Sequence, residues 1–293
     1  FLKQIKNRIN DVKPDAIVLG ETLCDLREAV DIPTDMVYAL LVDFHRDAEH
    51  ARPIAEFLEC TFGAFAPRTV ALGYFENHDS ARATRIWRER YAGLLSGEAE
   101  LARTWRKRSA EHDPSLVMAL LKNLQASLID ATAGTALCVN LAYGLEFGTA
   151  WGEEERTEFE QPTLYRSEIP DEPPRACLMR SYEALHRLRG ELPELRDGHI
   201  YFHRNEFAGG DPEDRVLAYT RYTPESGLVV VHNLDPCRAR QVTCRLEGLQ
   251  GVAWERVEGE VVFDSYSFFF EGARAGKVAM KSDGLRVSIE PLQ

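Results

Sequence analysis

A carboxylate, an imidazole and an amide lie side by side in one short segment of this chain. Residues 70–75 form an apolar run with the length of a buried strand, and the polar segment follows it directly. The segment contains Asn77, His78, Asp79 and, three residues further on, Arg82. In parallel α/β proteins, ligands and reactive groups gather at the carboxyl ends of the strands. The spacing therefore predicts a binding or catalytic site here.

A second acid has similar surroundings. The apolar run of residues 16–20 closes on Glu21, and helical sequence separates it from the run at 70–75. Two strands that each end in an acid predict two carboxylates, those of Glu21 and Asp79, that face one pocket. A glutamate at a strand end is more often solvated or ion-paired than catalytic, so this prediction depends on the elements around it.

The elements that must position these acids alternate between strands and helices. Strands are predicted at 15–20, 36–42, 70–75 and 136–141, and helices at 1–10, 47–60, 80–91, 98–111, 115–130 and 175–189. This order implies parallel strands joined by helical crossovers. Residues 80–91 and 98–111 are rich in arginine and glutamate and are predicted to be exposed helices. Residues 115–130 have the pattern of an amphipathic helix.

The pattern changes near residue 198. Strand-like runs at 199–204, 214–223, 227–232, 239–246, 252–257, 260–270 and 285–290 alternate with Gly, Pro and Asp turns. None of them has a helical period, so they predict an antiparallel sandwich with its own core. We therefore predict an α/β domain over residues 1–197 and an all-β domain over residues 198–293.

Composition and spacing exclude several classes of function. The formal net charge is −12 and the pI is near 5.2, which argues against nucleic-acid binding. No apolar run approaches the length of a membrane span. The six cysteines are scattered without a CxxC pair, and the group Asp43, His45, Asp47 and His50 lacks the spacing of metal ligands. We expect no metal, no cofactor, no nucleic-acid or membrane partner, and a cytoplasmic location.

Five short motifs occur in order along the chain. They are Gly20-Glu21 after a strand, Phe75–Arg82, Gly134–Gly148 around a strand, Leu185–Leu195 on a helix, and the strand pair within Val216–Asn233. Each motif is weak alone, but their order and spacing together resemble the C-terminal half of the α-amylase superfamily of retaining glycoside hydrolases and transglycosidases. In this resemblance Gly20-Glu21 corresponds to the fifth-strand motif and Phe75–Arg82 to the seventh-strand motif.

The resemblance implies the second half of a (β/α)8 TIM barrel, followed by an antiparallel β-sandwich. It also implies an enzyme that acts on the α-glucosidic bonds of an α-glucan or oligosaccharide. Glu21 would be the general acid/base, and Asp79 would bind sugar hydroxyls and stabilise an oxocarbenium-like transition state. The substrate-binding set would be His78, which contacts the same sugar, Asn77, which holds the motif loop, and Arg82, a charge partner.

The resemblance also implies a part that this chain lacks. The mechanism needs a nucleophilic carboxylate, which in this family ends the fourth barrel strand within an Arg-x-Asp motif, and no such pattern precedes Gly20. A crossover helix at 1–10 is expected to follow a strand in a parallel sheet. We therefore expect a companion, either a missing N-terminal half of the barrel or a second copy joined along the open edge. The chain by itself is expected to be inactive.

The sequence leaves other functions open. If a sugar rather than water is the acceptor, the enzyme is a maltosyl-transferring transglycosidase. Compared with common amylases, the chain has three extra residues between Gly134-Thr135 and Gly148, and in this it resembles maltosyl-transferring members of the family. A non-catalytic carbohydrate-binding relative is a second alternative, and an independent glycan-binding module over residues 198–293 is a third. Exposed aromatic rings on the sandwich would favour the module, whereas packing against residues 100–190 would favour a domain that stabilises the barrel.

Some of these residues also have plain structural interpretations. Asp79 is a good cap for a helix that starts at Ser80. Residues 153–156 have the composition of an exposed charged loop, or of a rim that contacts substrate. Residues 268–270 are three phenylalanines, which suit a sandwich core or a carbohydrate-stacking platform.

Overall fold

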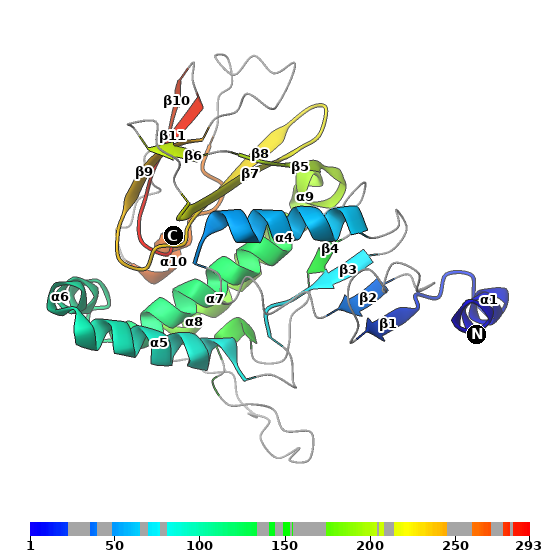
Figure 1. The fold of residues 1–293 in the computed structure, drawn as a ribbon, viewed down its shortest axis with the longest axis horizontal. Coiled ribbons are helices and arrows are strands. Elements are labelled where there is room, and N and C mark those ends of the chain that lie inside the picture. Colours follow the sequence, from blue (N-terminus) through cyan, green and yellow to red (C-terminus); the bar gives the residue numbers. More distant parts are fainter. Residues whose placement is uncertain are drawn as a thin grey trace.

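The computed structural model describes most of the chain (Figure 1). The described residues are 1–22, 36–39, 49–64, 70–76, 81–133, 141–143, 149–152, 154, 174–203, 205–207, 214–244, 260–270, 278–281 and 284–293. The α/β pattern of the first part and the antiparallel β pattern of the second, as predicted from the sequence, are both present. The predicted strand at 252–257 and the group from Asp43 to Asp47 lie outside the described residues.

A parallel sheet forms the first part of the fold. Its strands are β1 (Leu19–Thr22), β2 (Met36–Ala39), β3 (Val70–Gly73) and β4 (Leu141–Tyr143), and they follow one another in chain order. Each pair of neighbours is parallel, so all four carboxyl ends lie at the same edge. Of the strand predicted at 136–141, Leu141 is the first residue of β4, and residues 136–140 lie outside the described residues.

Helices make the connections that parallel strands require. These elements are α1 (Leu2–Val12), α4 (Ala51–Ala64), α5 (Ala83–Gly97), α6 (Ala99–Arg108), α7 (Pro114–Ala133), the 3-10 turn η1 (Thr149–Trp151), α8 (Arg175–Glu191) and α9 (Pro193–Asp197). In Figure 1, α1 lies at one extreme of the molecule, beyond β1, while α5, α7 and α8 run together near its centre. The long α7 packs against α5 on one side and α8 on another.

The prediction that α5 and α6 are exposed is wrong. Trp87 of α5 and Trp105 of α6 are among the largest fully buried side chains, and both belong to one apolar cluster with Phe75. The charged residues of these helices cover the outer surface, while the aromatic residues form a stripe along the inner one. Composition averaged over a helix concealed this stripe, because a few large rings are enough to anchor it.

Helix α7 is buried on almost every side, including its polar face. Lys122 donates to Gln125 at 2.9 Å, and Gln125 in turn donates to the carbonyl of Asn233 at 2.8 Å. All three side chains are at most 5% exposed. One face of this amphipathic helix therefore packs against apolar side chains. The polar face is buried as well and makes hydrogen bonds, because buried polar groups need partners.

Two antiparallel sheets form the second part of the fold. One contains β6 (Asn205–Phe207), β9 (Arg240–Cys244), β10 (Val278–Lys281) and β11 (Gly284–Ile289), in the order β10-β11-β9-β6. The other contains β5 (His199–Phe202), β7 (Val216–Tyr222) and β8 (Gly227–Asn233), in the order β5-β7-β8. Side chains from β7, β9 and β11 form a shared apolar core. Residues 282–283 between β10 and β11 are outside the described part.

The strand predicted at 260–270 is wrong. Residues 266–269 form the short helix α10 (Tyr266–Phe269), and residues 260–265 are not in a strand. The carboxylate of Asp264 accepts the backbone N–H of Tyr266 at 3.0 Å, which closes the first turn. Phe269 and Phe270 pack against apolar clusters of the helical part, and all three phenylalanines are half-buried, so they do not form a platform of fully exposed rings.

The antiparallel part packs on α6, α7 and α9. Trp105 donates its indole N–H to the carbonyl of Pro236 at 3.1 Å, and the hydroxyls of Thr132 and Tyr219 lie 2.6 Å apart. The buried guanidinium of Arg221 donates to the carbonyls of Thr132, Glu194 and Gly198. These contacts favour a stabilising β domain over an independent glycan-binding module.

Burial of His232 in this interface predicts a pH-dependent stability. Its side chain is 2% exposed, and burial, followed by the charge of Lys122, lowers its pKa from 6.5 to about 3. Between these two values the unfolded chain binds a proton that the folded chain does not. The free energy of unfolding is therefore expected to fall as the pH drops below about 6.5, by about 2 to 3 kcal/mol at pH 4.5.

Urea unfolding at pH 7 and pH 4.5 measures this dependence. In His232→Gln the unfolding free energy is expected to fall less between pH 7 and pH 4.5 than in the wild type, because the histidine contribution is gone. His112→Gln, at an exposed histidine, should keep the pH dependence of the wild type. An identical pH slope in wild type and His232→Gln would contradict the assignment.

Among the described residues, no helix combines the length and the apolar composition that a bilayer crossing requires.

Candidate functional site

β1, which carries Glu21, and β3, which precedes the segment that contains Asp79, lie on either side of β2 in the parallel sheet. Gly20 of β1 is paired with Val37 of β2, which is paired with Ala71 of β3. Neighbouring strands lie about 4.8 Å apart, so the backbones of Gly20 and Ala71 are about 10 Å apart. Because the strands are parallel, the segments after β1 and after β3 begin at the same edge of the sheet.

Glu21 belongs to this edge. It is the third residue of β1 and pairs with Tyr38 of β2. The predicted strand at 15–20 is thus displaced: the observed strand starts at Leu19 and includes Glu21 rather than ending before it. The side chain of Glu21 lies outside what the structure describes, as do Asn77, His78 and Asp79, which fall within the gap at 77–80.

The residues on either side of that gap are described and buried. Tyr74, Phe75 and Glu76 are 3%, 1% and 2% exposed. On the other side, Arg82 is 2% exposed and its Nη1 lies 3.1 Å from Oε1 of Glu76. Both ends of the segment that contains the predicted site residues are therefore in the interior, and an ion pair joins them.

The helix after this segment starts later than predicted. We expected a helix from Ser80 with Asp79 as its cap, but Ala81 and Arg82 are not helical and α5 begins at Ala83. The N-cap residue, Arg82, makes no side-chain cap bond. Oε2 of Glu76 instead accepts the backbone N–H of Ala83 at 2.8 Å. The capping carboxylate thus comes from residue 76, on the strand side of the segment.

A buried polar network surrounds Glu76. The hydroxyl of Thr149 in η1 donates to the Glu76 carboxylate, and the carbonyl of Thr149 accepts from the amide of Asn123 at 3.1 Å. The same amide donates to Thr84 at 3.0 Å, while the hydroxyl of Tyr182 donates to Oδ1 of Asn123 at 2.7 Å. The network links the end of β3 to α5, α7 and α8.

Local geometry holds η1 in place for this network. Gly152, the residue after η1, has φ +64, and a Cβ there would overlap the side chain of Leu120 on α7. Glycine is the residue that allows both the left-handed backbone and the close approach. The carbonyl of Gly152 also accepts a hydrogen bond from Arg175 at the start of α8.

Glu154 differs from the predicted exposed loop. Arg88 of α5 reaches both of its oxygens at 2.9 Å, and Arg175 of α8 pairs with Oε1. The side chain of Glu154 is 20% exposed. Arginines from two different helices thus hold this carboxylate, so Glu154 joins α5 and α8. Glu153 and Glu155 lie outside the described residues.

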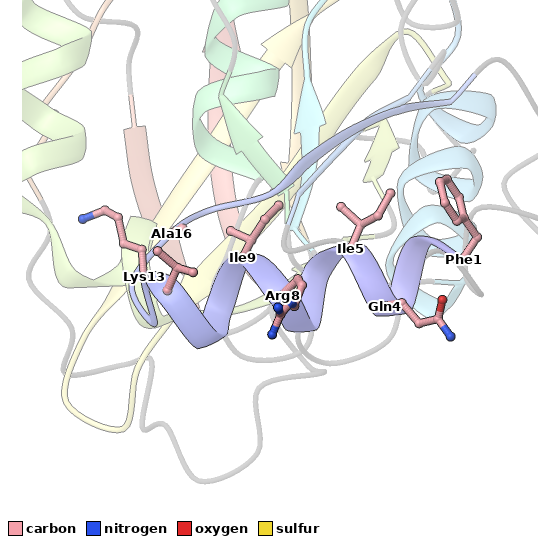
Figure 2. A pocket seen from close by; sticks show the side chains of 8 residues that line it. Phe1, Gln4, Ile5, Arg8, Ile9, Lys13 and Ala16 are labelled. Atoms are coloured by element: carbon pink, nitrogen blue, oxygen red, sulfur yellow. The ribbon is translucent and has the colours of Figure 1, made fainter.

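A hollow of the described surface lies along α1, and its lining residues, from Phe1 to Ala16, precede Glu21 in the chain. Phe1, Ile5 and Ile9 point to one side of the helix, while Gln4 and Arg8 point away from them (Figure 2). Phe1 and Val12 are 90% and 88% exposed. No carboxylate lines this hollow, so it offers an apolar contact surface rather than a place for acid/base chemistry.

The described part of the chain contains no group of three or more His, Cys, Asp or Glu side chains that could hold a metal ion. Cys177, Cys237 and Cys244 are free thiols. Burial raises the pKa of the Cys244 thiol to about 12, which keeps it protonated and unreactive.

The sequence reasoning identified Arg82 but missed Glu76 and Thr149. Glu76 could have been recognised as a candidate, because it directly follows an aromatic residue of an apolar run and precedes the helix by seven residues. Nothing local distinguishes Thr149, because its partner is 73 residues away in the chain.

Comparison with solved structures shows a known fold across the whole chain. The structure is similar to that of an α-amylase from H. orenii, with TM-score 0.65 and 15% identity, over 99% of this chain and 55% of that one. It is similar to a debranching enzyme from Nostoc punctiforme, soaked with acarbose, with TM-score 0.64 and 13% identity, over 100% of this chain and 52% of that one.

A third match has a sugar bound. AmyP in complex with maltotriose has TM-score 0.64 and 9% identity, over 99% of this chain and 60% of that one. The chain therefore spans between half and three fifths of the length of these three structures. The predicted resemblance to α-amylase-type proteins is confirmed as a likeness of fold. No family model matches the sequence, and no curated protein does.

Proposed function

We propose that this chain is the C-terminal half of a retaining glycosidase that acts on α-glucosidic bonds. The observation that carries the proposal is the match of almost the whole chain to about half of an α-amylase and a debranching enzyme. In this proposal the sheet β1–β4 is the second half of a (β/α)8 barrel. The chain divides into a barrel part, residues 1–197, and a β-sandwich, residues 198–293.

The proposed site uses the shared edge of the parallel strands. Glu21 is the general acid/base, which protonates the glycosidic oxygen and later deprotonates the incoming water. Asp79 binds the hydroxyls of the sugar and stabilises its positive charge in the transition state. The strand order supports this pairing, because Glu21 lies on β1 and the segment that contains Asp79 follows β3 at the same edge of the sheet, two strands away. His78, Asn77 and Arg82 complete the substrate-binding set.

The burial of Arg82 refines its part in this proposal. Its side chain is 2% exposed and pairs with Glu76, so Arg82 supports the sugar-binding segment by joining its end to the end of the preceding strand rather than by contacting the sugar. A buried charge that lost its partner would be strongly unfavourable, which makes the pair a durable element of the site.

The proposal includes a companion that supplies the nucleophile. β1 is at the end of the described parallel sheet; its first residue, Leu19, is 53% exposed, and Ile17, just before it, is 71% exposed. Together with the apolar side of α1 they form an uncovered sheet edge and helix face, which proteins ordinarily pair or cover. The companion is the N-terminal half of the barrel, and self-association of this chain is the alternative.

Hydrolysis and transfer differ only in the acceptor, so one assay separates them. Glucose and maltose from maltotriose indicate hydrolysis, whereas products longer than maltotriose indicate maltosyl transfer. A non-catalytic carbohydrate-binding relative would bind maltotriose without converting it.

The test compares the complete gene product with residues 1–293 alone. We expect the complete protein to convert maltotriose with retention of the α-anomer, as followed by NMR, and residues 1–293 alone to be inactive, because the nucleophile is supplied by the companion. Activity of residues 1–293 as a lone monomer, checked by light scattering, would contradict the companion. Failure of the complete protein to convert maltotriose or longer α-glucans would contradict the proposed function.

A further inference from the structure

Glu76 is a carboxylate in an unusual place. It follows β3 closely, is 2% exposed, and precedes the residues proposed to bind sugar. Removing a carboxylate from water is unfavourable unless several donors replace the lost hydration. A buried glutamate at this position therefore calls for a reason beyond filling space.

The donors to Glu76 come from the far end of the segment and from a third element. Arg82 Nη1 and the backbone N–H of Ala83 reach it at 3.1 Å and 2.8 Å from the far end of the segment. The hydroxyl of Thr149 reaches it from η1. The negative charge also lies at the N-terminus of α5, where the helix dipole favours it and where Arg82, the N-cap residue, makes no capping bond with its side chain.

The anchoring of these donors is rigid. Thr149 is tied through its carbonyl to Asn123 in the middle of α7, and Tyr182 of α8 holds the other end of that amide. Thr84, Asn123 and Thr149 are at most 2% exposed. Within the described residues, the Glu76 carboxylate is thus joined to the central helices.

We propose that Glu76 is a positioning residue that clamps the two ends of the segment 77–82 and so fixes where Asp79 stands relative to the sugar. The inference rests on the proposed function, in which Asp79 stabilises the transition state. Glu76 itself does not touch substrate, because three donors and the surrounding core already occupy its carboxylate. The clamp predicts an effect on the chemical step rather than on substrate affinity.

The test replaces Glu76 by glutamine in the complete protein. Glu76→Gln keeps the shape of the side chain but removes the charge that Arg82 and the α5 terminus require. The matched control is Glu89→Gln on the adjoining helix α5, where Glu89 forms an exposed pair with Arg85 at 3.0 Å. Two readouts are compared: steady-state kinetics on maltotriose, and amide hydrogen exchange of a peptide that covers residues 81–86.

A clamp gives a distinctive combination of results. We expect Glu76→Gln to lower kcat by about 100-fold with KM within about threefold, since a small displacement of a group that acts in the transition state acts mainly on kcat. Exchange at residues 82–84 is expected to rise about tenfold or more, because the Ala83 amide loses its carboxylate acceptor. Glu89→Gln is expected to leave both readouts unchanged. If Glu76→Gln behaves like Glu89→Gln in both, the inference is overturned while the proposed function stands.

A second variant covers the case in which Glu76→Gln does not fold. Thr149→Val removes one donor and keeps the ion pair, so we expect a several-fold loss in kcat and faster exchange at residues 82–84. Unchanged values in Thr149→Val would overturn the clamp. If the complete protein does not convert maltotriose, the proposed function fails and amide hydrogen exchange alone tests the clamp. Faster exchange at residues 82–84 in Glu76→Gln but not in Glu89→Gln supports the clamp. Equal exchange in the two variants overturns it.

Discussion

Glu21→Gln is expected to lower kcat/KM on maltotriose by about 100-fold or more in the complete protein. Glutamine has nearly the same shape but has no proton to give to the glycosidic oxygen, and general acid/base catalysis contributes about 10²–10⁴-fold. The measurement is the initial rate of glucose and maltose release. Glu225→Gln, at an exposed turn between β7 and β8, is the matched control and should keep full activity.

A second substrate separates an acid role from a structural one. An aryl α-glycoside with an acidic phenol as leaving group needs little protonation, so Glu21→Gln should lose far less activity on its first chemical step. Burst kinetics with this substrate would then show release of the phenol followed by slow turnover. An equal loss with both substrates would contradict the acid role of Glu21, and unchanged activity on maltotriose would remove Glu21 from the site.

Trp87→Ala is expected to reduce the free energy of unfolding by about 3–5 kcal/mol. Trp87 is fully buried in the cluster that α5, α6 and α7 share, and its ring lies 5.6 Å from that of Phe75, centroid to centroid. Alanine would leave a cavity below the strand end that precedes Glu76. The loss would be a large share of the roughly 5–15 kcal/mol that stabilises a typical protein, and urea unfolding followed by circular dichroism measures it.

Two controls keep this result specific to packing. Trp87→Phe retains most of the apolar volume and should be destabilised less than Trp87→Ala. Arg85→Ala, at an exposed pair on the same helix, should leave the unfolding free energy nearly unchanged. A loss below about 1 kcal/mol for Trp87→Ala would show that α5 is held mainly by its polar contacts.

The buried polar network around Glu76 adds something that apolar packing does not provide, which is a fixed direction for each contact. Apolar packing alone would hold α5 and α7 together, as the cluster around Trp87 and Met118 does. Hydrogen bonds from Asn123 and Thr149 add direction, because an amide and a hydroxyl accept only certain geometries. A site that must hold a carboxylate at a set distance from a sugar benefits from such fixed geometry.

Local pattern by itself determined the order of strands and helices. The apolar runs near 16–20 and 70–75 predicted two parallel strands, and the change of period near residue 198 predicted the antiparallel part. These features are encoded within a few residues, because a strand or a helix imposes its own period on the sequence. The placement of Glu21 at the end of one such run was available from the sequence for the same reason.

Only the tertiary structure decided which polar residues work together. Asp264 accepts a backbone hydrogen bond in the first turn of α10, within a run that was predicted to be a strand. The aromatic sides of α5 and α6 are buried in an apolar cluster. The cap of α5 comes from Glu76, and its third donor, Thr149, is 73 residues further along the chain. Such contacts depend on how whole elements pack, and the energy that selects them is shared among residues distant in sequence. No local period records that choice.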